Sequence, residues 1–355
     1  MIRHVAGAAL RGWHDVRLPG GEVPALIGEV DEQLLSGLLG GRVQRATEAH
    51  ASFGTTDHRV LQLEGEGIPA SVFVKTAPRS RVNRVFGDLS GLAANEVGFY
   101  TRVRPGLPVT APRCYAAQHD SRTGRFVLLL EDLGARGCTF LDVLQPLTVD
   151  QAAAALEELA ILHGRFWGSA PTWVHTNGAD PNLPLVTLAL RPLSRRLRDT
   201  GLVSDAGADV LRHYGRVARQ LDVGAHTLLH GDPHPGNLYV DGDRVGLLDW
   251  QVLRRGKALR DVVYLLVLGL ATEARLAYQE DLVAHYLAAL GTAGGPSLSR
   301  AAAWEDLRRL AAYPYVATVF TAGLGGLQPD STAMAGLRQA VAAFDDLDTA
   351  AALSR

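Results

Sequence analysis

The sequence has few cysteines, no strong imbalance of charge and no long hydrophobic run, and each shortage excludes a class of protein. Two cysteines, Cys114 and Cys138, are too few for a disulfide framework or a cysteine metal site. The 35 lysine and arginine residues nearly balance 37 acidic residues, for a net charge of −2, so no overall positive charge recruits nucleic acid. The longest apolar run, residues 262–271, is about half as long as a membrane span. We therefore expect a cytoplasmic protein that binds neither nucleic acid nor a membrane.

Two regions of different pattern follow one another along the 355 residues, a length sufficient for two domains with separate cores. Residues 30–39 have the pattern of a short amphipathic helix, and residues 43–76 alternate and turn like three antiparallel strands. A helical pattern over residues 88–103 precedes two more strand-like segments, 114–118 and 126–131. These elements predict a five-stranded antiparallel sheet that carries one helix.

Beyond residue 133 the chain becomes rich in alanine and leucine, and helical patterns cover residues 149–167, 204–221, 261–290 and 301–348. One hairpin interrupts them, because strands 237–240 and 245–250 flank Asp241-Gly242-Asp243, a strong tight-turn signal. We predict an α+β fold with two lobes. The small N-lobe, residues 1–133, contains the sheet, its helix and an N-terminal helical extension; the larger, mostly helical C-lobe is residues 134–355.

The most informative stretch of the sequence is His230-Gly231-Asp232-Pro233-His234-Pro235-Gly236-Asn237. Its two prolines and two glycines predict a loop, which presents its polar side chains instead of burying them in a strand ladder. The following hairpin brings a third oxygen-bearing side chain, Asp249, back toward Asp232 and Asn237. Such oxygen-rich sites suit hard cations, and phosphoryl transfer requires Mg²⁺ together with a carboxylate that orients the attacking hydroxyl.

This stretch resembles the protein-kinase catalytic loop H-R-D-x-x-x-x-N followed by D-F-G. The variant found here, H-G-D-x-H-x-x-N with D-W-Q, is more similar to small-molecule kinases of the aminoglycoside phosphotransferase, choline kinase and ecdysteroid-kinase-like families. The resemblance implies a protein-kinase-like fold. It also implies that Asp232 is the catalytic base and that Asn237 and Asp249 are the magnesium ligands.

The resemblance further requires a lysine on the third strand of the N-lobe and a glutamate on the next helix, which together position the nucleotide phosphates. Lys75 lies on the third predicted strand and Glu96 on the helix that follows it. A lone lysine on a strand is usually an exposed edge residue. The downstream motifs favour the functional assignment for Lys75.

Two weaker signals mark the remaining nucleotide contacts. Residues 128–133 resemble the hinge of the family, where backbone groups near Glu131 and Leu133 would bind the adenine edge. The candidate phosphate loop contains Ser52, Gly54 and Thr55, and its single glycine departs from the protein-kinase G-x-G-x-x-G pattern. Hydroxyl and backbone N–H groups would meet the phosphates there.

Three further residues are expected to support the catalytic loop. His230 and His234 lie four residues apart, a zinc-ligand spacing on a helix, but Pro233 and Pro235 argue against a helix here. By resemblance, His234 helps to hold the loop and His230 packs behind it. Asp261 opens an apolar helix, where an acid is an ordinary terminal charge. In kinase-like folds an acid at this place braces the catalytic loop.

The resemblance implies an enzyme that moves the γ-phosphate of ATP or GTP, with Mg²⁺, directly onto a hydroxyl of a small molecule. The acceptor stays open between an antibiotic, such as an aminoglycoside or a nucleoside, which would make this an antibiotic-resistance enzyme, and another metabolite alcohol. A kinase-like nucleotide-binding regulatory protein without catalysis is the alternative, and a homodimer is also left open. A cationic acceptor would call for clustered acids, for which the C-terminal helices offer Glu273, Glu280, Asp281, Glu305, Asp306, Asp345 and Asp346.

Overall fold

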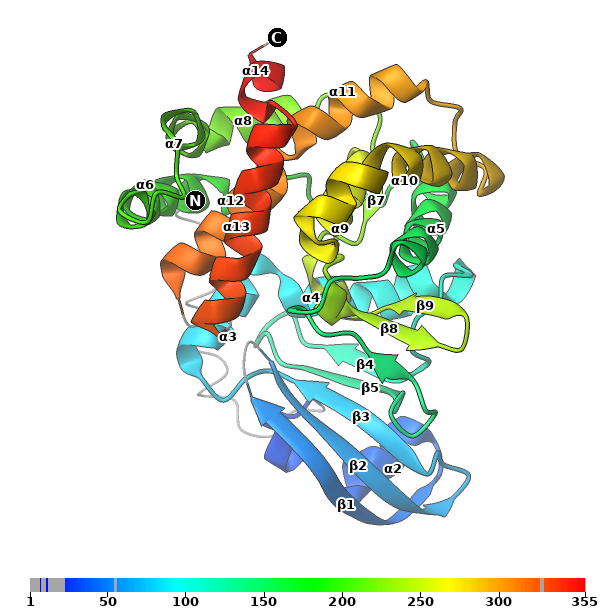
Figure 1. The fold of residues 1–355 in the computed structure, drawn as a ribbon. Helices are drawn as coiled ribbons and strands as arrows, with labels where there is room; N and C mark the ends of the chain where they lie inside the picture. Colours follow the sequence, from blue (N-terminus) through cyan, green and yellow to red (C-terminus); the bar gives the residue numbers. More distant parts are fainter. Residues whose placement is uncertain (1–6, 8–10, 12–22, 54–55, 326–328, 355) are drawn as a thin grey trace. The chain divides into compact units, whose positions relative to one another are not determined.

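The computed structural model describes residues 7, 11, 23–53, 56–325 and 329–354 (Figure 1). The chain forms two compact units. The first comprises the described residues of 1–106, together with 111–139 and 249–251. The second comprises residues 107–110, 140–248 and the described residues of 252–355. Residues 249–251 therefore belong to the first unit, although they follow the hairpin of the second.

The first unit is built on a five-stranded antiparallel sheet in the order β1-β2-β3-β5-β4, as predicted (Figure 1). In the sheet Lys75, on β3, pairs with His58 on β2 and Leu128 on β5, so it lies on the central strand. The strands are β1 (Arg42–Phe53), β2 (Asp57–Glu66), β3 (Ser71–Thr76), β4 (Cys114–His119) and β5 (Phe126–Glu131).

The core of this unit forms between one face of the sheet and helix α2 (Glu32–Leu39). Val72 and Val74 of β3 pack there with Leu35 of α2. Because side chains alternate along a strand, Lys75 faces the opposite side of the sheet from these valines. The helix has its own terminal signals: the Asp31 side chain accepts the Leu34 N–H, and Gly40 ends it in the left-handed conformation.

The helical segment between β3 and β4 differs from the single helix predicted over residues 88–103. Helix α3 (Arg81–Ser90) begins earlier, at the N-cap Ser80, and the left-handed Gly91 separates it from α4 (Leu92–Gly98). The periodic pattern continues across Gly91, so sequence reasoning missed both the start and the break. The short helical turns of this unit are η1 (Ile27–Glu29), η2 (Phe99–Val103) and η3 (Arg104–Gly106), and the chain leaves the unit at β6 (Thr139–Phe140).

The second unit is mostly helical, as predicted, and α5 packs against α9 and α10 at its centre. The expected helix 261–290 is two helices, since α9 ends at the extended residue Leu270. Helix α6 was not predicted. The helices are α5 (Val149–Arg165), α6 (Leu183–Arg198), α7 (Asp205–Arg212), α8 (Tyr214–Leu221), α9 (Leu259–Gly269), α10 (Thr272–Thr292), α11 (Arg300–Leu310), α12 (Ala312–Leu324), α13 (Asp330–Asp346) and α14 (Thr349–Leu353).

The predicted hairpin is present in the second unit as β8 (Leu238–Asp241) and β9 (Arg244–Leu247), with Gly242 in the left-handed conformation at its turn. Its second strand ends earlier than expected. Strands β7 (Thr227–Leu229) and β10 (Arg254–Gly256) form a separate pair. The turns η4 (Pro235–Asn237) and η5 (Trp250–Val252) flank the hairpin. It is this hairpin that carries the chain from the loop of Asp232 to Asp249.

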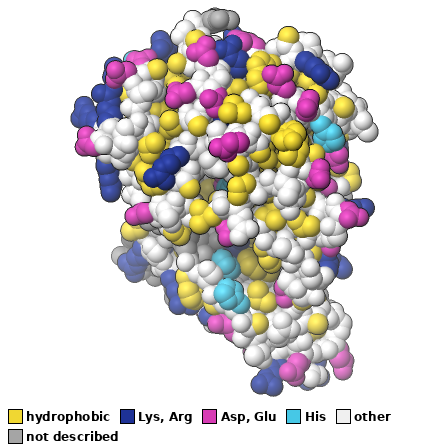
Figure 2. Space-filling model, viewed as in Figure 1, with side chains coloured by type: hydrophobic (Ala, Val, Ile, Leu, Met, Phe, Trp, Pro, Cys, Tyr) yellow, Lys and Arg dark blue, Asp and Glu magenta, His cyan; other side chains and the backbone are white. Residues whose placement is uncertain are grey.

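The surface of the second unit includes one arginine-rich helix. Arg191, Arg195, Arg196 and Arg198 of α6 are exposed, and Figure 2 shows Lys and Arg side chains gathered on this side of the face that it draws. The longest apolar run forms the buried helix α9 instead of a surface. Among the described residues, no helix is long and apolar enough to cross a membrane.

Candidate functional site

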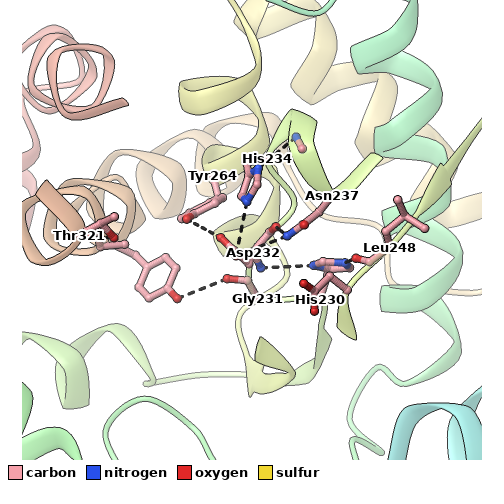
Figure 3. Close-up of polar contacts among 12 residues, drawn as sticks. His230, Gly231, Asp232, His234, Asn237, Leu248, Tyr264 and Thr321 are labelled. Carbon is pink, nitrogen blue, oxygen red and sulfur yellow. Dashed lines mark hydrogen bonds and ion pairs between the residues drawn. The ribbon is translucent and has the colours of Figure 1, made fainter. Parts of the chain in front are cut away.

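Asp232 lies at the centre of the loop that precedes the hairpin, and three side chains point toward its carboxylate (Figure 3). The Tyr264 hydroxyl donates to Asp232 Oδ1 at 2.6 Å. Asn237 Nδ2 lies 2.9 Å from the Asp232 carbonyl and 3.4 Å from Oδ2, and His234 Nε2 lies 3.6 Å from Oδ2. The Asp232 side chain keeps 24% of its surface exposed. The carboxylate is therefore held at one oxygen and accessible from solvent.

His230 supports this loop from its buried side. Its Nδ1 accepts the Asp232 N–H at 3.3 Å, so the proton of the neutral ring is on Nε2, which donates to the Leu248 carbonyl at 2.8 Å. The Leu248 N–H in turn donates to the Asn237 carbonyl at 2.8 Å. The loop and the residue just before Asp249 are thus tied together by hydrogen bonds. His234 adds a local bond, because its Nδ1 accepts the Gly236 N–H.

Asp261 fixes the backbone of the same loop. Its Oδ2 accepts the His230 N–H at 2.7 Å and its Oδ1 accepts the Gly231 N–H at 3.1 Å. Burial alone would raise the pKa of Asp261, but the hydrogen bond from His163 and the nearby Arg260 hold this pKa below its ordinary value. Asp261 is therefore a buried anion that accepts two backbone N–H groups.

Gly231 occupies the place where protein kinases have arginine, and the structure explains the difference. Its φ is +90°, and a Cβ atom built on it would lie 2.0 Å from the Val252 carbonyl oxygen. A side chain at this position would have to displace backbone. The local path of the loop thus requires glycine.

In the first unit, Lys75 joins two carboxylates. Its Nζ lies 2.8 Å from Glu96 Oε2 and 3.1 Å from Asp249 Oδ1. The Lys75 and Glu96 side chains are 6% and 2% exposed, whereas that of Asp249 is 30% exposed. Burial alone would lower the pKa of Lys75, but the two carboxylates outweigh it and raise this pKa, which keeps the ammonium charged.

Glu96 and Asp249 compete for this one ammonium group. Burial, the largest influence, together with the charge of Asp249 raises the pKa of Glu96 to about 7, against the opposing effect of Lys75. A second cation beside the partly exposed carboxylate of Asp249 would relieve this competition. This observation fits a metal ion at Asp249 and leaves the buried Glu96 to Lys75.

The backbone of Asp249 is itself unusual, since its φ is +57°. The residues that follow hold it in this conformation. The Trp250 ring stacks on Phe99 with a centroid distance of 3.7 Å, and Asn95 Nδ2 donates to the Gln251 carbonyl at 2.9 Å. Positive φ values in residues other than glycine are costly and concentrate at functional sites.

The metal ligands expected from the sequence are Asn237 and Asp249. Both offer oxygen atoms: Nδ2 of Asn237 faces Asp232, which leaves its Oδ1 as the ligand atom, and Asp249 offers a partly exposed carboxylate. Mg²⁺ typically binds one or two such protein oxygens and completes its shell with water and phosphate oxygens. Among the described residues, no group of three or more His, Cys, Asp and Glu side chains is arranged to hold a metal.

The remaining predicted nucleotide contacts are in the first unit. Ser52 lies near the end of β1, while Gly54 and Thr55 lie outside the described residues. Glu131 ends β5, where its carboxylate binds Arg136 at 3.0 Å. Leu133 is buried, and its carbonyl accepts the Cys138 N–H.

Sequence reasoning missed the tyrosines around the loop of Asp232. Tyr264 binds Asp232, Tyr313 donates to the Gly231 carbonyl at 3.3 Å, and Tyr286 lies 2.9 Å from His163 Nδ1. Tyr264 alone had a local signal, because it follows Asp261 by three residues on one helix and so shares its face. The other two come from α10 and α12, and nothing in their own segments indicates the contact.

Comparison with known proteins assigns the chain to a family. The sequence profile of the phosphotransferase enzyme family matches residues 58–312, well over half of the chain. No curated protein sequence matches it.

Among solved structures, the chain is similar to a choline kinase from Streptococcus pneumoniae, with 13% identity, a TM-score of 0.52, and coverage of 90% of this chain and 99% of that one. A choline kinase from Cryptosporidium parvum Iowa II has 10% identity, a TM-score of 0.55 and coverage of 97% of both chains. An AMP-bound spectinomycin phosphotransferase has 14% identity, a TM-score of 0.52 and coverage of 91% and 96%. At these identities the likeness establishes the fold, which is protein-kinase-like.

Proposed function

The chain belongs to the phosphotransferase enzyme family, and from this premise we propose that it transfers the γ-phosphate of ATP or GTP to a hydroxyl group of a small molecule. The observation that carries the proposal is the buried ion pair between Lys75 and Glu96, which Asp249 joins. A buried lysine with two carboxylates has no evident structural use on a central strand. It suits a site that receives both phosphate and a cation.

In this proposal each predicted residue has its own task. Lys75, held by Glu96, binds phosphate oxygens of the nucleotide, and backbone groups near Glu131 and Leu133 bind the base. Ser52, together with Gly54 and Thr55, would offer hydroxyl and backbone N–H groups to the phosphates. Asn237 and Asp249 hold Mg²⁺, which when bound neutralises charge on the phosphate oxygens.

The transfer itself is a single displacement. The acceptor oxygen forms a bond to the γ-phosphorus while the bond from that phosphorus to the β–γ bridging oxygen breaks, so that the nucleoside diphosphate leaves. The acceptor proton passes to the carboxylate of Asp232. His230, His234 and Asp261 keep that carboxylate and the loop in position.

The charges of the second unit favour a neutral or singly charged acceptor over a polycation. Several of the acids that could have formed a pocket for a cationic acceptor already have basic partners. Asp306 binds Lys257 at 2.7 Å, Glu305 binds Arg308 at 3.1 Å, and Asp346 binds Arg275. Near the loop itself, the buried Arg260 lies 3.5 Å over the Tyr313 ring. Arg260 is only 3% exposed, so it adds positive charge beside the loop without contacting an acceptor itself.

A coupled assay of nucleotide consumption tests the proposal. Mg²⁺ with ATP or GTP is offered with neutral sugars, amino alcohols, nucleosides, steroid alcohols and aminoglycosides, and Asp232→Ala serves as the control. We expect acceptor-dependent turnover that the variant loses. Turnover retained in Asp232→Ala would overturn the assignment of the base.

Lysine labelling tests the nucleotide site without an acceptor. Lys75 and Lys257 are the two lysines of the sequence, and Lys257 is bound to Asp306. An acyl-phosphate derivative of ATP, which acylates lysines at nucleotide sites, should therefore label Lys75 far faster than Lys257, and free ATP should protect Lys75. Protected labelling with no turnover on any acceptor would favour the regulatory alternative, whereas equal labelling of both lysines would contradict the site.

A further inference from the structure

The hydroxyl of Tyr264 makes a short hydrogen bond to one carboxylate oxygen of Asp232, whereas the other oxygen has only longer contacts. Its distance to Oδ1 is 2.6 Å, whereas the nearest groups to Oδ2 are Asn237 Nδ2 at 3.4 Å and His234 Nε2 at 3.6 Å (Figure 3). Short O–H···O⁻ bonds to a carboxylate are among the stronger hydrogen bonds in proteins. The two oxygens of Asp232 are therefore not equivalent.

Tyr264 is well placed to be a fixed donor. Tyr264 is only 6% exposed, and it lies on helix α9, whose residues are almost all buried. Burial, and next the charge of Asp232, raise the pKa of Tyr264 well above its ordinary value, so the phenol keeps its proton. The phenol can then only donate to the carboxylate that it faces.

Helix α9 holds the loop by two side chains one turn apart. Asp261 accepts the N–H groups of His230 and Gly231, and Tyr264, three residues later on the same face, donates to the side chain of Asp232. The Tyr264 ring lies 5.6 Å from that of Tyr313, whose hydroxyl donates to the Gly231 carbonyl. Backbone and side chain of the loop are thus fixed by the same helix.

We propose that Tyr264 is a positioning residue that binds Oδ1 of Asp232 and thereby directs Oδ2 toward the hydroxyl of the acceptor. The proposal rests on the proposed function, in which Asp232 accepts the proton of that hydroxyl. Without the phenol, the carboxylate can rotate about its side-chain torsions and present either oxygen. The reacting geometry is then populated for less of the time, which lowers the rate of transfer without weakening nucleotide binding.

The test compares Tyr264→Phe with Tyr315→Phe. Both changes remove one hydroxyl from a buried tyrosine of the second unit, but the Tyr315 hydroxyl has no hydrogen-bond partner among the described residues. Steady-state constants are measured with an acceptor from the screen and, without any acceptor, for hydrolysis of Mg-ATP, in which water replaces the alcohol. Melting temperatures are measured for all variants, and a crystal structure of Tyr264→Phe records the orientation of Asp232.

We expect kcat of Tyr264→Phe to fall about tenfold to hundredfold with KM for the nucleotide unchanged, as for a lost hydrogen bond to a charged group. The crystal structure should show the Asp232 carboxylate rotated, and Tyr315→Phe should keep the wild-type kcat. An unchanged kcat and carboxylate orientation in Tyr264→Phe would overturn the inference. So would a loss of kcat matched by a lower melting temperature and recovered on cooling, because that pattern indicates a structural role.

The outcome of Asp232→Ala separates this inference from the proposed function. If Asp232→Ala retains turnover, the base assignment fails and the inference fails with it. If Asp232→Ala is inactive while Tyr264→Phe behaves as wild type, the proposed function stands and the positioning role of Tyr264 alone is wrong.

Discussion

Asp261 Oδ2 and His163 Nε2 lie 3.3 Å apart, and neither residue has any solvent exposure. The Tyr286 hydroxyl lies on the other side of the ring, 2.9 Å from Nδ1. Burial, foremost, raises the pKa of Tyr286 well above its ordinary value, so this phenol donates to Nδ1 and the ring donates from Nε2 to Asp261. Three helices, α5, α9 and α10, thus supply a buried chain of hydrogen bonds that ends at the backbone of the loop of Asp232.

Replacing Asp261 with asparagine should destabilise the protein. An amide has one acceptor oxygen where the carboxylate has two, so at least one buried N–H loses its partner. We expect a loss of roughly 2–4 kcal/mol in the free energy of unfolding at pH 7, measured by urea denaturation. Asp281→Asn, an exposed position on α10, is the control and should change stability little.

The pH dependence of this loss has a definite sign. The pKa of Asp261 is below its ordinary value in the folded protein, so its stabilisation is present above the unfolded pKa and is lost as the pH falls through the folded pKa. The difference between wild type and Asp261→Asn should therefore be full at pH 7 and shrink in acid. A difference that grows toward low pH would contradict the buried anion.

Local patterns allowed much of the first unit, and the hairpin of the second unit, to be predicted. Alternation and turn residues indicated all five strands, and Asp241-Gly242-Asp243 located the hairpin. These signals lie within the segments that they describe. The break at Gly91 was missed because an apolar periodicity continues through it, and α6 was missed because its proline and arginines weaken the helical pattern.

Only those residues of the candidate site that belong to sequence motifs could be predicted. Resemblance pointed to Lys75, Glu96 and Asp249. In the structure, one carboxylate oxygen of Glu96 and one of Asp249 lie within 3.1 Å of Lys75 Nζ. Tyr286 and Tyr313 stand in no such motif. Their contacts depend on how α10 and α12 pack, a long-range property that no local pattern encodes.

Gly231 should not tolerate a side chain. Alanine would place Cβ 2.0 Å from the Val252 carbonyl in addition to adopting a positive φ. We expect Gly231→Ala to lower kcat by about a hundredfold or more, because a shift of the loop displaces Asp232. The measurement is steady-state turnover, with circular dichroism to confirm folding.

Gly242→Ala is the matched control for that change. Gly242 also has a positive φ, +61°, but a Cβ there would meet nothing within 4 Å. This variant should lose about 1–2 kcal/mol of stability from backbone strain and keep the wild-type kcat. An equal loss of kcat in Gly231→Ala and Gly242→Ala would show that the close approach to Val252 does not cause the loss.

Asp249→Asn should remove the effect of Mg²⁺ on nucleotide binding. Asparagine tolerates the left-handed backbone, so the change removes the charge without forcing a new conformation. We expect EDTA to weaken ATP binding to wild type by about tenfold or more and to leave the weaker binding of the variant unchanged, as measured by calorimetry.

Asp348→Asn controls for the backbone in that experiment. Asp348 also has a positive φ, +48°, and lies in the second unit, where it binds Arg308. Its variant should keep the full response to Mg²⁺. If Asp249→Asn also responds to EDTA as wild type does, Asp249 is not a metal ligand.

Glu158 should make the stability of the protein depend on pH with the opposite sign to Asp261. Its two oxygens accept the Thr110 N–H at 2.6 Å and the Thr110 hydroxyl at 2.7 Å, yet burial, the largest influence, raises its pKa above the ordinary value. Protonation therefore favours the folded state, and this stabilisation is lost as the pH rises through the folded pKa. Glutamine mimics the protonated acid at every pH, since its oxygen can accept the N–H while its amide donates to the hydroxyl.

We therefore expect Glu158→Gln to match wild type in acid and to become the more stable protein as the pH rises to 8. Urea denaturation at several pH values measures the difference. Glu280→Gln, an exposed position on α10, should follow wild type throughout. A variant less stable than wild type at pH 8 would mean that the charged hydrogen bonds to Thr110 outweigh the cost of burying the carboxylate, and that Glu158 secures this segment as an anion.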